Sequence, residues 1–128
     1  MRCGAAMAKD GRQFLGKVGE DLACTELRRR GYELLDRRYR TRFGEIDIVA
    51  RHRGAIVFVE VKTRAGGAFG NGAAAVTGAK QHRISRMAVD FLSRRHLTNH
   101  PCRFDVVAIS FNRGLPRVDV YENAFEVL

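Results

Sequence analysis

Hydrophobic and polar residues follow two different periods along this chain, and the period separates expected helices from expected strands. Apolar residues recur at helical spacing in residues 11–31 and 73–95. Elsewhere they alternate with polar residues, as in strands. Five segments have this character: residues 32–39, 45–51, 55–62, 103–111 and 117–121. The resulting order, α-β-β-β-α-β-β, predicts an α/β fold with a mixed sheet flanked by helices.

Glycine-containing segments separate these elements. Gly31 stands where the C-terminus of a helix favours glycine. Residues 52–54 are a connection short enough to join the strands on either side as a hairpin. The glycine-rich residues 63–72 are expected to form a loop, which fits a flap over a substrate as well as a plain connector.

The length of 128 residues is that of one domain. We expect residues 12–128 to form it and residues 1–11 to be a flexible N-terminus. No apolar run approaches the roughly 18 residues of a transmembrane helix, so no membrane association is expected. The three cysteines lack a CxxC pair, which favours reduced thiols and a cytoplasmic location.

The charge balance is strongly positive. The chain has 23 Lys and Arg against 14 Asp and Glu, a net charge of +9, and 19 of the basic residues are Arg. Because the planar guanidinium group suits phosphate, this balance predicts a polyanionic partner such as nucleic acid. Solvated basic faces are the alternative. A membrane surface is less favoured, since the charge is not gathered on one amphipathic helix.

Two carboxylates are expected to meet within the predicted hairpin. Glu60 and Lys62 share one face of their strand with apolar residues. If the turn centres on residues 53 and 54, paired positions sum to 107 and Asp47 lies opposite Glu60. Opposed like charges destabilise a sheet unless a divalent cation lies between them, and oxygen ligands suit Mg²⁺ or Mn²⁺. An ordinary salt bridge between Asp47 and Lys62 is the alternative.

The first helix contributes a third acid. Glu20 lies among apolar positions on the helical wheel, and Gly16 and Gly19 beside it permit a close approach of backbone or ligand. The alternative is a surface Glu20 that pairs with Lys17 or Arg12.

Asp47, the Glu60–Lys62 segment and the helix Glu together resemble the PD-(D/E)xK nuclease superfamily. A closer resemblance, to the bacterial YraN family, covers about residues 12–127. It is carried by GKVGEDLA (16–23), RGYELLDRRYR (30–40), GEIDIVA (44–50), VFVEVKTR (57–64), KQHRI (80–84) and RFDVVAI (103–109). That family is similar to the archaeal Holliday-junction resolvases. The resemblance implies a restriction-endonuclease-like α-β-β-β-α-β core.

The resemblance also implies roles for matching residues. Asp47 and Glu60 would bind Mg²⁺ or Mn²⁺, with Glu20 as a further metal or water ligand. Lys62 would orient or activate the attacking water. Glu45 lies on the same strand face as Asp47 but is not part of the minimal motif, so no role is assigned to it. Ile46 stands where the motif often has proline, a departure that lowers its specificity. The analogy further implies a homodimer that cleaves branched or structured DNA.

Basic residues around these positions are expected to contact phosphates without reading bases. The expected nucleic-acid-binding residues are Arg38, Arg40, Arg42, Arg64, Lys80 and Arg83. Asp105 is expected to be structural, paired with an arginine. The sequence thus predicts a metal-dependent endonuclease, and the alternative is a non-catalytic basic nucleic-acid-binding protein.

Overall fold

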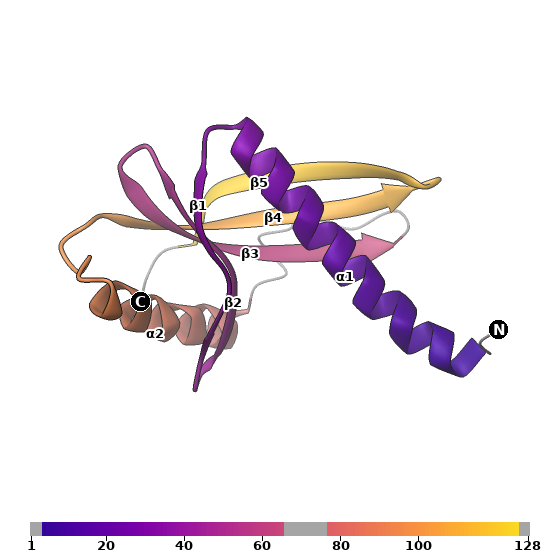
Figure 1. Ribbon diagram of the computed structural model, residues 1–128, viewed down its shortest axis with the longest axis horizontal. Coiled ribbons are helices and arrows are strands. Elements are labelled where there is room, and N and C mark those ends of the chain that lie inside the picture. The colour runs from indigo at the N-terminus through magenta and orange to yellow at the C-terminus, as the bar shows by residue number, and fades with distance from the viewer. Residues whose placement is uncertain (1–3, 66–76, 126–128) are drawn as a thin grey trace.

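A computed structural model describes residues 4–65 and 77–125 and shows a five-stranded mixed sheet with one helix on each face (Figure 1). The sheet order is β1-β2-β3-β4-β5, and only β3 and β4 run parallel. This confirms the predicted fold class and is consistent with a restriction-endonuclease-like core. The elements are α1 (Gly4–Arg29), β1 (Glu33–Thr41), β2 (Gly44–His52), β3 (Ala55–Ala65), α2 (Gly78–Arg94), β4 (Cys102–Asn112) and β5 (Leu115–Phe125).

The element boundaries differ from the expected ones at three places. α1 begins at Gly4, earlier than expected. β3 runs to Ala65 because its pairing with β4 continues to that residue, so ladder hydrogen bonds override the glycine-rich composition there. β5 is longer than predicted because it pairs along most of β4. The rest of the expected glycine loop and residues 73–76 of the expected helix lie outside the described residues.

The sheet is covered on both faces, as the apolar strand pattern predicts. Ile56 and Phe58 of β3 pack into a core beneath α2. Val57 and Val59 point the other way, into a core beneath α1. Within the described residues, neither helix is both long and apolar enough to cross a membrane.

Helix ends fix how the chain enters and leaves the sheet. Gly31 has φ +93°, and the Tyr32 N–H donates to the Leu27 carbonyl at 2.9 Å, which is the expected glycine stop of α1. At the start of α2, the Thr77 hydroxyl oxygen accepts from the Lys80 N–H at 3.2 Å. This cap places Lys80 in the first turn of α2.

α1 approaches β3 most closely at Gly19. A Cβ at this position would overlap the Thr63 hydroxyl oxygen, so a residue without a side chain is needed for the observed packing. Gly16, in contrast, has open space where its Cβ would be. The predicted close approach is thus confirmed at Gly19, whereas at Gly16 no other part of the described chain comes close. The close packing of α1 on β3 at Gly19 holds the next residue, Glu20, beside the sheet.

Asp105 lies at the opposite end of the sheet in a buried polar network. Its carboxylate is fully buried and accepts from the Tyr32 hydroxyl at 2.6 Å, the Arg103 guanidinium at 2.9 Å and the Asn123 N–H at 2.9 Å. Arg103 also contacts the His52 ring nitrogen Nδ1 at 2.8 Å. The expected pairing of Asp105 with an arginine is therefore confirmed, and the network ties β2, β4 and β5 to Tyr32, which follows α1.

Candidate functional site

The candidate site lies where β2 and β3 separate. Their ladder runs from His52 opposite Ala55 to Ile48 opposite Val59, so paired numbers sum to 107 as predicted. Asp47 and Glu60 are the next positions in this register, just past the last paired residues. Beyond them the two strands diverge, β2 staying with β1 and β3 staying with β4 (Figure 1). The predicted register is confirmed, and it brings both carboxylates to this fork.

β2 loses its regular alternation at Asp47. Ile46 packs in the core under α2, whereas Ile48 packs in the core under α1, although residues two apart in a regular strand share a face. In β1, Arg38 faces this irregular position and has φ 55°. The distortion across β1 and β2 turns Asp47 out of the apolar face and toward β3.

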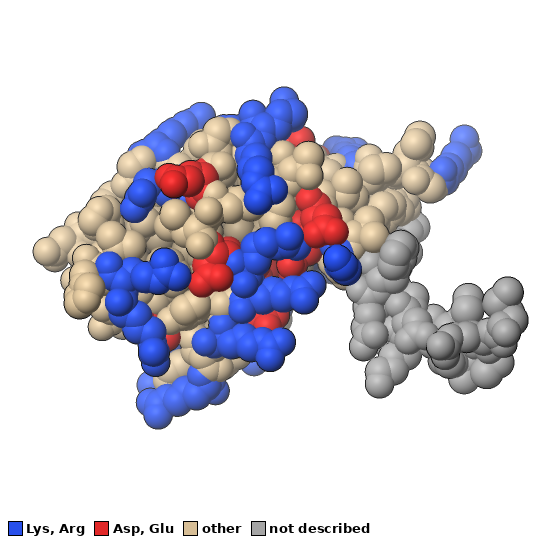
Figure 2. Space-filling view, viewed as in Figure 1, with Lys and Arg blue, Asp and Glu red and all other residues tan. Residues whose placement is uncertain are grey.

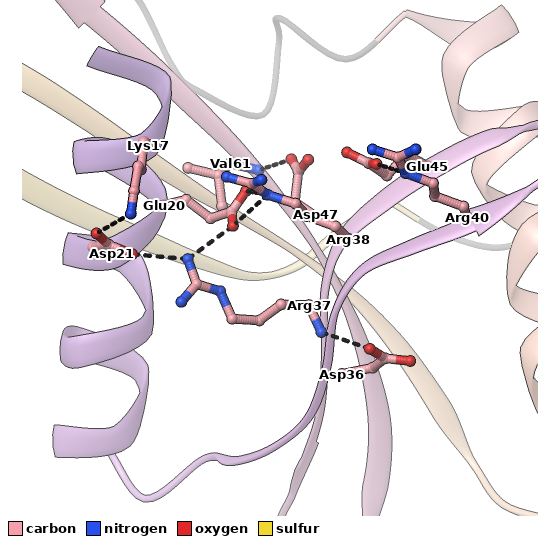
Figure 3. A network of polar contacts seen from close by, with 10 residues as sticks. All are labelled: Lys17, Glu20, Asp21, Asp36, Arg37, Arg38, Arg40, Glu45, Asp47 and Val61. Carbon is pink, nitrogen blue, oxygen red and sulfur yellow. Dashed lines mark hydrogen bonds and ion pairs between the residues drawn. The ribbon is translucent and has the colours of Figure 1, made fainter. Parts of the chain in front are cut away.

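The Asp47 carboxylate is fixed by the backbone of β3. Its Oδ2 accepts a hydrogen bond from the Val61 N–H at 2.8 Å (Figure 3). Burial raises the pKa of Asp47 to about 7, and the nearby negative charges of Glu60 and Glu20 add to the rise. The Val61 hydrogen bond and the charge of Lys80 act in the opposite direction. Asp47 is therefore a carboxylate that is crowded by negative charge.

Glu60 is buried and held by two lysines. Its Oε2 forms an ion pair with the Lys80 ammonium and lies 3.5 Å from the Lys62 ammonium. Burial lowers the pKa of Lys62, and the positive charge of Lys80 lowers it further. For Lys80, burial acts downward, but the hydrogen bonds to Glu60 and Lys62 and the negative charges of Glu60 and Asp47 together outweigh it, so the pKa is raised. Glu60 thus pairs mainly with Lys80 and leaves Lys62 less tightly bound.

Glu20 adjoins the fork from α1, but it is engaged with arginines of β1. The side chain is buried and accepts from Arg37 at 2.8 Å and from Arg38 at 3.1 Å (Figure 3). The surface alternative with Lys17 is wrong, since Lys17 pairs instead with Asp21 at 3.9 Å. Glu20 lies near enough to Asp47 to raise its pKa. Whether Glu20 serves as a ligand stays a prediction.

Basic side chains surround the acids on the face seen in Figure 2, where Asp and Glu lie among Lys and Arg. Three of the expected phosphate contacts are engaged with these acids: Arg38 with Glu20, Arg40 with Glu45 at 2.9 Å, and Lys80 with Glu60. Their guanidinium and ammonium groups are therefore shared with the carboxylates around the fork.

The remaining expected phosphate contacts are Arg42, Arg64 and Arg83. Arg42 stacks on the Phe43 ring at the tip of the β1–β2 hairpin. Arg83 is exposed on α2 beside Gly44 of the same hairpin, and Arg64 is exposed near the end of β3. Arg42 and Arg83 thus lie at the β1–β2 hairpin tip, whereas Arg64 lies at the end of β3.

The donor set at the fork fits Mg²⁺ or Mn²⁺. Both carry oxygen-only ligand sets, and Mg²⁺ usually takes one or two carboxylates while keeping several waters. Within residues 4–65 and 77–125, no group of three or more His, Cys, Asp or Glu is arranged to hold a metal. Asp47, whose pKa is raised by burial and by the charge of Glu60, and Glu60 itself are two oxygen donors of the kind such an ion prefers.

The contacts of Lys80 and Arg37 with the acids could not be identified from the sequence. Lys80 was expected to line the nucleic acid, yet it forms an ion pair with Glu60, which brings the first turn of α2 to the middle of β3. Arg37 binds Glu20 across the space between β1 and α1. The spacing of Lys80 and Arg37 along the chain does not relate them to Glu60 and Glu20. The sequence therefore gives no signal that would select these two among its 23 basic residues.

Comparisons with known proteins give the chain close relatives. A profile described as "Uncharacterised protein family UPF0102" matches residues 19–109, which include Glu20, Asp47, Glu60 and Lys62. A UPF0102 protein of Geobacter metallireducens is 47% identical over 113 residues, covering 88% of this chain and 93% of that protein. A UPF0102 protein of Anaeromyxobacter dehalogenans is 43% identical over 126 residues, covering 98% and 94%. One of Rhodococcus opacus is 46% identical over 114 residues, covering 87% and 95%.

Proposed function

The chain belongs to the UPF0102 (YraN) family, and we propose that it is a divalent-metal-dependent nuclease that hydrolyses phosphodiester bonds in branched or structured DNA. The observation that carries this proposal is the meeting of Asp47 and Glu60 at the β2–β3 fork, with Lys62 two residues along β3. A structural role alone does not account for placing Asp47 where burial and the charge of Glu60 both oppose its ionisation.

Asp47 and Glu60 are the residues that would hold Mg²⁺ or Mn²⁺. When bound, such an ion lowers the pKa of a coordinated water and polarises a phosphoryl oxygen. Asp47 is prepared for this task because the Val61 N–H fixes one carboxylate oxygen. Lys80 holds the Glu60 carboxylate at the fork through its ion pair.

Lys62 would act on the water and on the phosphate. Its ammonium lies 3.5 Å from Glu60 Oε2 and is about one-quarter exposed, so it faces both the acids and the solvent side of the fork. Because burial lowers its pKa, the Lys62 ammonium gives up a proton more readily than that of an ordinary lysine. In its charged form it would offset the negative charge that grows on the phosphate during hydrolysis.

The positive charge around the fork would bind the DNA backbone. Phosphate contacts set position and do not read sequence, so this chain would select DNA by shape. A homodimer would present two such sites to a junction with two symmetric cleavage points. Light scattering of the purified protein would test the dimer.

The proposal is tested by incubating the protein with four-way-junction, flap and linear DNA in Mg²⁺, in Mn²⁺ and in EDTA. We expect strand cleavage with either metal, stronger on the branched substrates, and none in EDTA. Binding to all three substrates without cleavage of any would contradict the proposal. That outcome would favour a non-catalytic nucleic-acid-binding protein, in which the ion pairs of Glu20 and Glu60 serve the fold alone.

A further inference from the structure

An aromatic residue at the tip of the β1–β2 hairpin lies between two arginines. The guanidinium carbon of Arg42 is 5.0 Å from the Phe43 ring centroid, and that of Arg86, from α2, is 4.8 Å away. Such cation–π contacts hold a guanidinium plane against a ring. The Phe43 ring therefore joins the hairpin tip to the outer side of α2.

Next to this ring the surface is hollowed. The hollow has a volume of about 440 Å³ and is lined by Phe43, Arg86, Val89, Asp90 and Ser93. This volume lies within the roughly 300–1,000 Å³ typical of sites for small organic groups. Val89 is 61% exposed, one of two large apolar side chains so exposed among the described residues. The hollow thus combines an apolar floor with a polar rim.

The charges around the hollow favour a nucleic acid. Among the described residues, Arg42, Arg83 and Arg86 form no salt bridge with an acid, unlike Arg38 and Arg40 nearer the fork. Three guanidinium groups are therefore available to phosphates at this end of the molecule.

The acid in the hollow is already engaged. Asp90 accepts from the Tyr39 hydroxyl at 2.7 Å and from Arg94 at 3.2 Å. Its carboxylate would repel a phosphate inside the hollow but can accept from the amino group of a base. The rim therefore suits phosphates, and the interior suits a base.

A row of basic residues joins the hollow to the fork. Lys80, which contacts Glu60, is followed on α2 by Arg83 and Arg86 at intervals of three residues. The six residues from Lys80 to Arg86 span about 9 Å along the helix axis. That length corresponds to roughly two to three nucleotides of a stacked strand.

We propose that the Phe43–Arg86 hollow binds an unpaired base of a DNA strand whose phosphates lie along Arg83 and Arg42. The base stacks on the Arg86 guanidinium plane, which is held against the Phe43 ring, a mode that accepts any base. This assignment deepens the proposed nuclease function and rests on it only for the position of the cut. The preferred substrate then carries unpaired nucleotides two to three positions from the bond at the fork.

The test is a binding measurement in EDTA, which needs no cleavage. Fluorescence anisotropy compares a blunt 20-base-pair duplex with the same duplex carrying a four-nucleotide single-stranded tail. The wild type is expected to bind the tailed duplex about tenfold more tightly, as one stacked base would give. Arg86→Lys keeps the positive charge and removes the planar guanidinium group. Phe43→Leu keeps an apolar side chain and removes the aromatic ring. Each is expected to abolish the preference for the tail, measured as the ratio of the affinities for the tailed and the blunt duplex.

Arg117→Lys is the matched control, since Arg117 is an exposed arginine of β5, and it should keep the preference for the tail. Phe43→Tyr should keep it as well, because a ring remains. Equal binding of tailed and blunt DNA by the wild type would overturn the assignment, as would an unchanged preference in both Arg86→Lys and Phe43→Leu. A tail preference in a protein that cleaves nothing would support the hollow and contradict only the nuclease function.

Discussion

The Asp47 carboxylate accepts a hydrogen bond from the backbone N–H of Val61 at 2.8 Å, across the point where β2 and β3 stop pairing. Val61 stands between Glu60 and Lys62, so this single bond fixes Asp47 beside the other two groups of the candidate site. The bond also partly compensates the negative charge that burial and Glu60 make unfavourable on Asp47. The account of function rests on this arrangement.

Replacing Asp47 by asparagine should stabilise the protein at alkaline pH in the absence of metal. The pKa of Asp47 is raised from 3.8 to about 7 on folding, so its ionisation opposes folding increasingly as the pH rises from about 4 to above 7. Asp47→Asn removes the charge and keeps an oxygen to accept from Val61. We expect a gain of about 2–4 kcal/mol in unfolding free energy at pH 8.

The gain should shrink toward zero as the pH falls to about 4, close to the unfolded-state pKa of 3.8, because below that pKa the Asp47 carboxyl is protonated in both states. Urea unfolding in EDTA at the two pH values measures it. Glu45→Gln is the control, since Glu45 is an exposed partner of Arg40 and should show no such gain. A loss of stability in Asp47→Asn at pH 8 would show that the carboxylate is not under electrostatic strain.

Manganese should raise the melting temperature of the wild type through the same carboxylates. A ligand that binds only the folded protein at 100 times its dissociation constant adds about 2.7 kcal/mol. The rise should be larger at pH 8 than at pH 6, because protons compete for Asp47 at the lower pH. Asp47→Asn and Glu60→Gln should abolish the rise and Glu45→Gln should keep it. An equal rise in all four proteins would place the ion elsewhere.

The register of the β2–β3 hairpin could be predicted because the turn at Arg53 and Gly54 and the alternation on both sides agree on one pairing. It placed Asp47 and Glu60 together. The β2 distortion at Asp47 could not be predicted, since Ile46 and Ile48 look equivalent in the sequence and only the twisted sheet sends them to opposite cores.

Partners that meet only in the folded protein were also beyond the sequence. Glu20 was placed correctly as an unusual acid in an apolar setting, yet its arginines come from β1, which is 17 and 18 residues away along the chain. The Lys80–Glu60 pair joins α2 to β3 in the same way. Such pairs depend on how the helices pack against the sheet, and the hydrophobic period and residue spacing of the sequence do not indicate that packing.

Removing the Asp105 carboxylate should destabilise the fold strongly. Asp105→Ala leaves the partly buried Arg103 without its counter-charge, and breaking a buried pair of this kind typically costs about 3–5 kcal/mol. Asp119→Ala is the matched control, because its pair with Arg117 is exposed and should contribute less than about 1 kcal/mol. Urea unfolding measures both. Similar small losses in the two variants would refute a supporting role for the Asp105 network.

The two glycines of α1 should respond oppositely to alanine. Gly16→Ala meets open space and should stabilise the helix by about 0.5–1 kcal/mol. Gly19→Ala would overlap the Thr63 hydroxyl and should cost about 1–3 kcal/mol. Adding Thr63→Ala to Gly19→Ala should recover most of the loss. Thermal melts would reveal this pattern, and equal effects of the two single substitutions would contradict the observed packing of α1 on β3.

The most direct test of the central claim is the single-turnover cleavage rate of a DNA four-way junction in Mn²⁺ by the wild type, Glu60→Gln, Lys62→Met and Glu45→Gln, purified in parallel. We expect the cleavage rates of Glu60→Gln and Lys62→Met to be at least about a hundredfold lower than that of the wild type, because removing one electrostatic group from an active site has an effect of this size. Glu45→Gln should cleave like the wild type. Cleavage at the wild-type rate by Glu60→Gln or Lys62→Met, or no cleavage by the wild type, would contradict the assignment of the fork as a nuclease site.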